Sequence, residues 1–249
     1  MLRKILILAG YFLLAAFLVV TLAFTARESR HVTCRNIHIE LREDESIRIS
    51  KDEIARLVHA ADKQLLGKDL RLIDTEWIEM EVEKHKAIQK AEVYKILTRD
   101  STSFNGTLAI RIRHREPALR VMSSGGNYYL DKDGEKIPVS TSYSANVLVA
   151  TGNFSEEYAR QELLPFVTFI NDDPFWKAQI KQIHIDKNGD ILLTPLVGDQ
   201  IIELGSLKDF PEKLRNMKAF YEQVLAQNNW DKYRLISLKY KNQVIAKKR

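Results

Sequence analysis

Two short acidic segments have residue types that could bind a metal ion. Segments 131–134 (DKDG) and 186–190 (DKNGD) place carboxylate and amide side chains beside a glycine, as calcium-binding loops do. Neither segment has the full ligand spacing, because the turn glycine comes too early. Both segments also suit the tight turn of a β-hairpin. We therefore expect hairpin turns and no bound metal.

The sequence contains no recognisable catalytic pattern. It has no G-x-G-x-x-G, no P-loop and no G-x-S-x-G nucleophile motif. The six histidines are scattered, and none has H-E-x-x-H spacing. The single cysteine, Cys34, cannot form an internal disulfide. We expect a protein that is not an enzyme and takes no cofactor.

A run of alternating arginines could support a different chemistry. In a predicted strand over residues 106–115, Arg111, Arg113 and Arg115 share one face and isoleucines share the other. This basic stripe could bind an acidic partner or lipid head groups, but we favour a solvated face of a half-buried strand. The net charge of +5 is spread along the chain without a dense basic run, so we expect no nucleic acid partner.

An uncharged apolar segment, residues 5–24, lies near the N-terminus. In a helix, about twenty apolar residues match the thickness of the hydrocarbon core, and the helix satisfies its own backbone. We expect a cytoplasmic tail over residues 1–4, a transmembrane helix over 5–24 and a linker over 25–32. The predicted anchor residues, which would contact membrane lipid, are Ile5, Leu8, Phe12, Leu14, Phe17, Val20 and Phe24.

The orientation of this helix follows from charge and size. Arg3 and Lys4 favour a cytoplasmic N-terminus, whereas Arg27 and Arg30 argue against it. A large C-terminal domain can be exported largely regardless of its own charge, so we expect the folded part outside the cytoplasm. Segment 21–23 (TLA) also offers a small-x-small cleavage site, which leaves a cleaved signal peptide as the alternative.

The first folded module, predicted over residues 33–116, has the order strand, helix, helix, strand, strand. Ser50 and Glu53 have the spacing of a capping box, which predicts a helix starting at Ser50. A second helix begins at Asp74 or Thr75 and turns Trp77 inward with Ile78 and Val82. The predicted strands are 32–41, 88–98 and 106–115. Pro117 marks the boundary, because proline cannot continue a central ladder.

The second module, predicted over 117–249, is a mixed β-rich domain with two helices, which makes the fold class α+β. Short strands are expected at 118–122, 128–130 and 146–150, a meander at 180–185, 190–196 and 200–204, and closing strands at 234–239 and 243–246. One helix begins at Ser155 and is kinked or split by Pro165. The other begins near Asp209, with an Asp-x-x-Glu cap. Its expected inward residues are Phe210, Leu214, Met217, Phe220 and Val224.

Together these features resemble the bacterial FtsQ (DivIB) cell-division family from the anchor to the C-terminus. The first module is similar to the family's POTRA domain. The residues that carry this similarity are Ile49, Ser50, Glu53, Ile54, Gly67, Leu70, Ile73, Asp74, Ile88, Ala91, Val93 and segments 108–112 and 115–118. The second module resembles the family's β domain in segments 129–134 and 235–246.

The resemblance implies a non-enzymatic divisome scaffold in the cell inner membrane, at the septum, with a single-pass anchor and periplasmic domains. In this family the POTRA domain supports recruitment, and the β domain binds FtsB and, through it, FtsL. The alternatives are a POTRA-bearing export or assembly factor and a cleaved soluble periplasmic protein.

A chain that finishes in strand is a candidate exposed sheet edge, to which a partner segment can add a strand. We expect partner binding at Lys239, Tyr240, Asn242, Gln243, Val244, Ile245 and Ala246.

Overall fold

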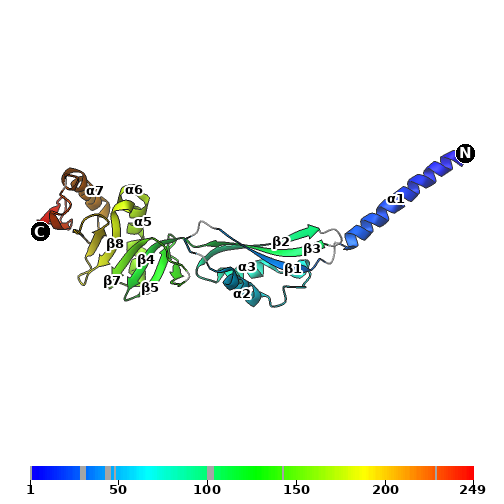
Figure 1. The fold of residues 1–249 in the computed structure, drawn as a ribbon, viewed down its shortest axis with the longest axis horizontal. Helices are drawn as coiled ribbons and strands as arrows, with labels where there is room; N and C mark the ends of the chain where they lie inside the picture. Colours follow the sequence, from blue (N-terminus) through cyan, green and yellow to red (C-terminus); the bar gives the residue numbers. More distant parts are fainter. Residues whose placement is uncertain are drawn as a thin grey trace. The chain divides into compact units, whose positions relative to one another are not determined.

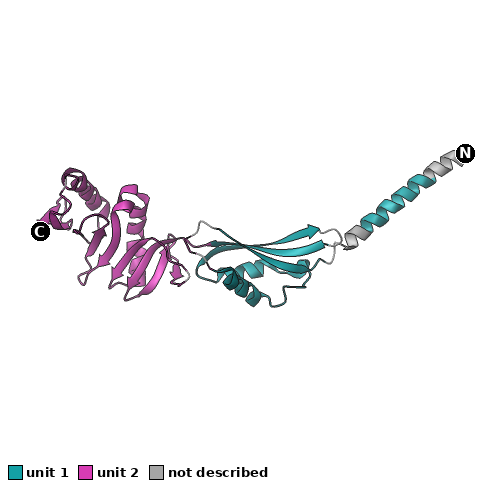
Figure 2. Cartoon of the chain, viewed as in Figure 1, with its two compact units in different colours: residues 1–42, 50–113 teal, residues 43–49, 114–249 magenta. Residues whose placement is uncertain are grey.

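The computed structural model describes residues 2–28, 32–42, 46–47, 49–99, 104–141, 143–227 and 229–249. The chain divides into two compact units, coloured separately in Figure 2. The first comprises residues 1–42 and 50–113, and the second comprises residues 43–49 and 114–249. Each unit is mixed α+β, and the second is the richer in strands.

Helix α1 (Leu2–Glu28) forms over the apolar N-terminal segment. Side chains of this helix are described for residues 9–23, so the predicted anchor residues Ile5, Leu8 and Phe24 lie outside that range. Within it, Phe12, Leu14, Phe17 and Val20 are exposed. In the part of the chain that the structure describes, no helix combines the length and apolar character needed to cross a membrane.

The first unit is a three-stranded sheet with helices packed against it (Figure 1), in the order that the sequence predicted. Its elements are β1 (Cys34–Leu41), α2 (Lys51–Ala61), a 3-10 turn (Leu70–Leu72), α3 (Thr75–Glu83), β2 (Ile88–Arg99) and β3 (Phe104–His114). The strand order is β1-β3-β2, and β1 runs parallel to β3. The central strand β3 therefore carries much of the buried apolar surface, including Leu108, Ile110 and Ile112.

Both helices of this unit begin where their caps predict. The Ser50 hydroxyl accepts a hydrogen bond from the Glu53 backbone N–H at 3.2 Å, and Asp74 does the same for Trp77 at 3.0 Å. The expectation that Trp77 points inward is wrong, because its side chain is 45% exposed. Ile78 and Val82, one turn apart, occupy the buried face of α3.

The second unit is built on a nine-stranded sheet with the order β12-β11-β10-β9-β8-β7-β4-β5-β6. The strands are β4 (Pro117–Ser123), β5 (Gly126–Asp131), β6 (Lys136–Pro138), β7 (Leu148–Gly152), β8 (Ile180–Ile185), β9 (Ile191–Pro195), β10 (Ile201–Gly205), β11 (Tyr233–Ser237) and β12 (Ile245–Lys248). The meander β8–β9–β10 is antiparallel, as predicted. Pro117 starts β4, a position where a missing N–H is tolerated even in an interior strand.

Helices cross between the parallel strands of this sheet. The connection from β7 to β8 contains α4 (Glu156–Tyr158), a π-helical turn (Ala159–Leu163), α5 (Leu164–Asp172) and α6 (Pro174–Gln179). The connection from β10 to β11 contains α7 (Phe210–Phe220) and a second π-helical turn (Tyr221–Leu225). Such crossovers are what parallel neighbours require. Residues of these helices and of the sheet form one apolar core.

Helix α7 departs from its prediction at both ends. Asp209 does not cap it with its side chain, because its backbone adopts φ 55° and the Glu212 N–H bonds to its carbonyl at 3.1 Å instead. Leu214 and Met217 are buried as expected. Farther along, Tyr221 and Leu225 are buried.

Phe210 and Phe220 are half-buried and pack against the core as expected, whereas Val224 is half-buried and is not among the core residues. A π-helical turn holds more residues per turn than an α-helix and shifts the inward face by about one position. Two short elements were not predicted, the strand β6 of three residues and the helix α6 of six.

Gly152 at the end of β7 provides a test of the β7–β8 pairing. Its φ is 130°, and a Cβ atom there would lie 2.2 Å from the carbonyl oxygen of Ile185. Gly152→Ala should lower the free energy of unfolding by about 3 kcal/mol, through backbone strain and the clash. Chemical denaturation of the purified chain measures this change in the free energy of unfolding.

The matched control is Gly189→Ala, where φ is 82° and no atom lies within 4 Å of the added Cβ. Strain alone should cost it about 1 kcal/mol. Equal losses in the two variants would contradict the close approach of β7 and β8.

Candidate partner-binding edge

Strand β12 lies at one end of the nine-stranded sheet. Among the described residues it pairs with β11 alone, antiparallel, with Ala246 opposite Ile236 and Ile245 opposite Ser237. Its outer backbone groups therefore face no neighbouring strand of the sheet. This edge contains the last of the residues that the sequence predicted for partner binding.

The predicted partner-binding residues divide into a turn and a strand. Residues 239–243 form the turn before β12, where the Gln243 N–H bonds to the Tyr240 carbonyl at 3.2 Å and Asn242 has φ 59°. Tyr240 is 58% exposed at this turn. Val244 and Ala246, by contrast, pack against the core.

Apolar side chains continue from β12 across the outer face of the sheet. Ile201 of β10 and Lys247 of β12 both pair with Leu235 of β11, so the three side chains share one face of the sheet. Ile245 is two residues from Lys247 and lies on this same face. Because alternate residues share a face, these side chains lie on the side opposite the buried Ile202 and Ile236. Ile201 is 43% and Ile245 46% exposed. The edge thus combines free backbone groups with exposed apolar side chains.

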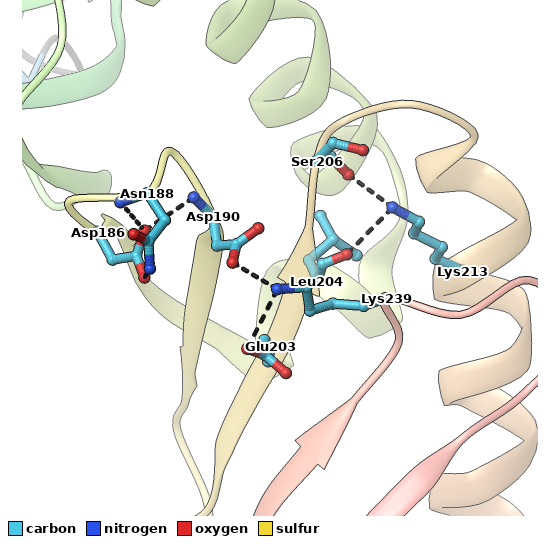
Figure 3. Close-up of polar contacts among 8 residues, drawn as sticks. All are labelled: Asp186, Asn188, Asp190, Glu203, Leu204, Ser206, Lys213 and Lys239. Carbon is cyan, nitrogen blue, oxygen red and sulfur yellow. Dashed lines mark hydrogen bonds and ion pairs between the residues drawn. The ribbon is translucent and has the colours of Figure 1, made fainter.

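Lys239 connects this terminal turn to the middle of the sheet (Figure 3). Its Nζ atom lies 2.6 Å from Oδ2 of Asp190, the residue before β9, and 3.8 Å from Oε1 of Glu203 in β10. The hydrogen bond with Asp190, strengthened by both carboxylates, raises the pKa of Lys239. Gly205 makes room for the Lys239 stem, since a Cβ there would lie 2.8 Å from its Cγ. Lys239 is therefore a positioning residue for the edge.

The two segments with calcium-like composition are hairpin turns held by their first aspartate. Asp186 accepts the backbone N–H groups of Asn188 and Asp190 at 2.8 and 2.9 Å (Figure 3). These bonds, that from Asp190 foremost, lower the pKa of the Asp186 carboxyl. Among the described residues, no group of three potential His, Cys, Asp or Glu ligands could hold a metal ion.

Asp131 plays the same part in the β5–β6 turn. Its Oδ1 accepts the backbone N–H groups of Asp133 and Glu135 at 3.0 and 2.7 Å. Its Oδ2 lies 2.9 Å from Nη1 of Arg115, and the Asp131 side chain is almost fully buried. Both carboxylate oxygens are thus engaged within the fold.

The three arginines of the predicted stripe have different environments. Arg111 bonds through Nε to Oε2 of Glu40 at 3.1 Å. The pKa of Glu40 is lowered by the Tyr94 hydroxyl and by Arg111. Arg113 is exposed on β3. Arg115 follows the end of β3, belongs to the second unit and is engaged with Asp131.

A pocket beside the terminal turn contains a lysine that the sequence reasoning missed. Lys213 on α7 donates hydrogen bonds from Nζ to the carbonyls of Leu204 and Ser206, at 3.1 and 2.7 Å (Figure 3). Burial lowers the pKa of this ammonium group. No local pattern marks Lys213, because its partners are the carbonyls of another element.

Lys239→Met tests the positioning role of this side chain. Without the bonds to Asp190 and Glu203, the terminal turn should open more often, and the amides of Leu238 and Gln243 should exchange at least tenfold faster. Hydrogen exchange read by mass spectrometry over residues 238–248 measures this. The control is Lys241→Met, two residues away and exposed. Similar exchange in both variants would exclude the positioning role.

Comparisons with known proteins agree with this architecture. A family model described as FtsQ/DivIB, C-terminal related, matches residues 116–247, and a model of a POTRA-like domain matches residues 32–101. The cell division protein FtsQ of Rhodothermus marinus is 28% identical over 225 residues, which cover 82% of this chain and 78% of that relative. The first match spans more than half of the 249 residues, and membership of its family points to a role in cell division. The chain therefore belongs to the FtsQ/DivIB family.

Proposed function

We propose that this chain is a non-enzymatic scaffold of the bacterial divisome. It binds FtsB- and FtsL-type single-pass proteins outside the cytoplasm and links early and late division proteins at the septum. Membership of the FtsQ/DivIB family supports the division role and favours it over export or assembly. The observation that carries the binding proposal is the position of β12 at the end of the nine-stranded sheet.

Strand addition is the binding mode that this edge supports best. A partner segment beside β12 would satisfy its outer backbone groups, and main-chain bonds of this kind supply affinity. Tyr240 and Ile245, both exposed, would be covered and would give side-chain selectivity. Lys247 and Lys248 disfavour pairing of two β12 strands and favour a partner segment with acidic residues.

The arginine stripe is a weaker candidate contact in this proposal. Arg113 is exposed, and no ion pair of its side chain occurs among the described residues. Arg111 is already paired with Glu40. An acidic partner meeting the first unit would therefore gain most from Arg113.

Site-specific photo-crosslinking in cells tests the β12 edge. A photoreactive residue at Tyr240 or at Ile245 should trap an FtsB-like protein, because the added partner strand would lie within reach of both side chains. The control is the same residue at Val139, an exposed apolar position next to β6 at the other end of the sheet. Trapping of the partner at Val139 but not at Ile245 would refute the assignment.

We propose in addition that residues 5–24 anchor the chain in the inner membrane by a single pass. In this arrangement residues 1–4 are cytoplasmic, and the POTRA-like domain over 33–116 and the β domain over 117–249 are periplasmic. The absence of charge over residues 5–24 supports the anchor. So does the exposure of Phe12, Phe17 and Val20, whose contact with water would be unfavourable.

Alkaline extraction of membranes tests this anchor. The wild-type chain should remain in the membrane pellet, and the double variant Leu14→Arg/Phe17→Arg should move to the supernatant, because charges at the bilayer centre are costly. The control is Leu72→Arg, which changes an exposed leucine of the first unit and should stay in the pellet. Release of the wild-type chain would overturn the anchor.

A further inference from the structure

The outer edge of β2 in the first unit is closed by two glutamates of α3. The backbone N–H of Ala91 donates to Oε1 of Glu83 at 3.0 Å, and that of Val93 donates to Oε1 of Glu79 at 2.7 Å. β2 is an end strand of the β1-β3-β2 sheet. Two backbone donors on its open side are therefore satisfied by side chains rather than by another strand.

These two amides are the donors that an added strand would need. Along a strand, successive N–H groups point to opposite sides, so those of Ala91 and Val93 share the side away from β3. A carboxylate that accepts a backbone N–H forms a charge-assisted bond, which is stronger than the neutral bond to a carbonyl. An incoming strand would have to displace both carboxylates.

Lys90 holds Glu83 in its capping position. The Lys90 ammonium lies 2.9 Å from the Glu83 carboxylate. Burial works to raise the pKa of Glu83, but the Ala91 amide and Lys90 together outweigh it and lower the pKa. Above the ordinary glutamate pKa of 4.5, Glu83 is therefore ionised and caps the Ala91 amide. This cap is lost only as the pH falls through the lowered pKa of Glu83.

At the other end of this sheet, the start of β1 is covered in a different way. At β1, the Cys34 N–H bonds to the Lys68 carbonyl and the Gly67 N–H bonds to the Cys34 carbonyl, both at 2.8 Å. These partners of β1 are backbone groups, which a side-chain substitution would not remove. The cover of β2 consists of two side chains, which a substitution can remove without altering the chain path.

We propose that Glu79 and Glu83 guard the β2 edge against strand addition by a second copy of this chain. The occupant they exclude is β2 of another molecule, paired antiparallel about Val93. In that register Ala91 faces Lys95 and Glu92 faces Tyr94, and the remaining pairs also bring no like charges together. The contact is self-complementary, as a two-fold dimer requires.

The length and surface of β2 suit this occupant. The strand has twelve residues, and beyond Val93 its helix-side face is uncovered, with Leu97 62% exposed. A long end strand with exposed apolar residues is prone to pair with its own kind unless it is blocked. In β12, by contrast, no backbone amide is capped by a side chain among the described residues. The guard of β2 does not depend on whether β12 binds the partner proposed above.

The test compares Glu79→Ala/Glu83→Ala with Glu76→Ala/Glu81→Ala in the full-length chain. The control pair lies on the same helix and removes the same charge, but neither residue caps β2. In the guard variant, the amides of Ala91 and Val93 should exchange at least tenfold faster at low concentration. Its mass by sedimentation should double relative to the wild type as the concentration rises, and the control should match the wild type.

A second variant covers the case in which the alanine pair fails to fold. Glu79→Asp/Glu83→Asp keeps both charges but shortens each side chain by one methylene, so that the carboxylates no longer reach the amides. The same gain in exchange and in mass is expected. Faster exchange without added self-association, or unchanged exchange, would overturn the proposal, whereas crosslinking at Ile245 would still report on β12 independently.

Discussion

The backbone groups at the ends of β-sheets are the constraint on which this structure depends. Every strand needs partners for its N–H and C=O groups on both sides, and an end strand has them on one side only. In the first unit, main chain covers the start of β1 at Cys34, and two glutamates cover part of β2. In the second unit, β12 has no such cover among the described residues. Among the described residues, the first unit thus covers backbone groups of its end strands, whereas the second leaves those of β12 uncovered.

The topology of the second unit explains why β12 is the strand left at the end. β11 pairs parallel with β10, so the chain must cross over through α7 before it returns to the sheet. Leu214 and Met217 of α7 join Ile202 and Ile236 in the core and hold that crossover in place. β12 can then pair only on the outer side of β11, since the inner side belongs to β10.

Acidic side chains stabilise several turns and ends of the described chain by accepting hydrogen bonds or forming ion pairs. Asp131 and Asp186 tie hairpin turns through backbone amides, and Asp190 anchors the terminal turn through Lys239. The same chemistry, a carboxylate accepting an N–H, caps α3 in its first turn and covers part of the β2 edge. A composition that could indicate metal binding is explained here by hydrogen bonding, because the carboxylates of Asp131, Asp186 and Asp190 already have donors within their own segment or nearby.

The sequence by itself determined the features that arise within a turn or two of chain. The cap at Ser50 and the hairpins at Gly134 and Gly189 follow from neighbouring residues, and the family resemblance follows from the same local patterns. Only the tertiary structure decided the parallel pairing of β10 with β11, the exposure of Trp77 and the inward shift to Tyr221. It also decided that Lys239 meets Asp190, 49 residues away, and that Glu79 meets Val93. Strand pairing uses backbone groups that all residues share, so residue types carry little information about which strands and side chains meet across the fold.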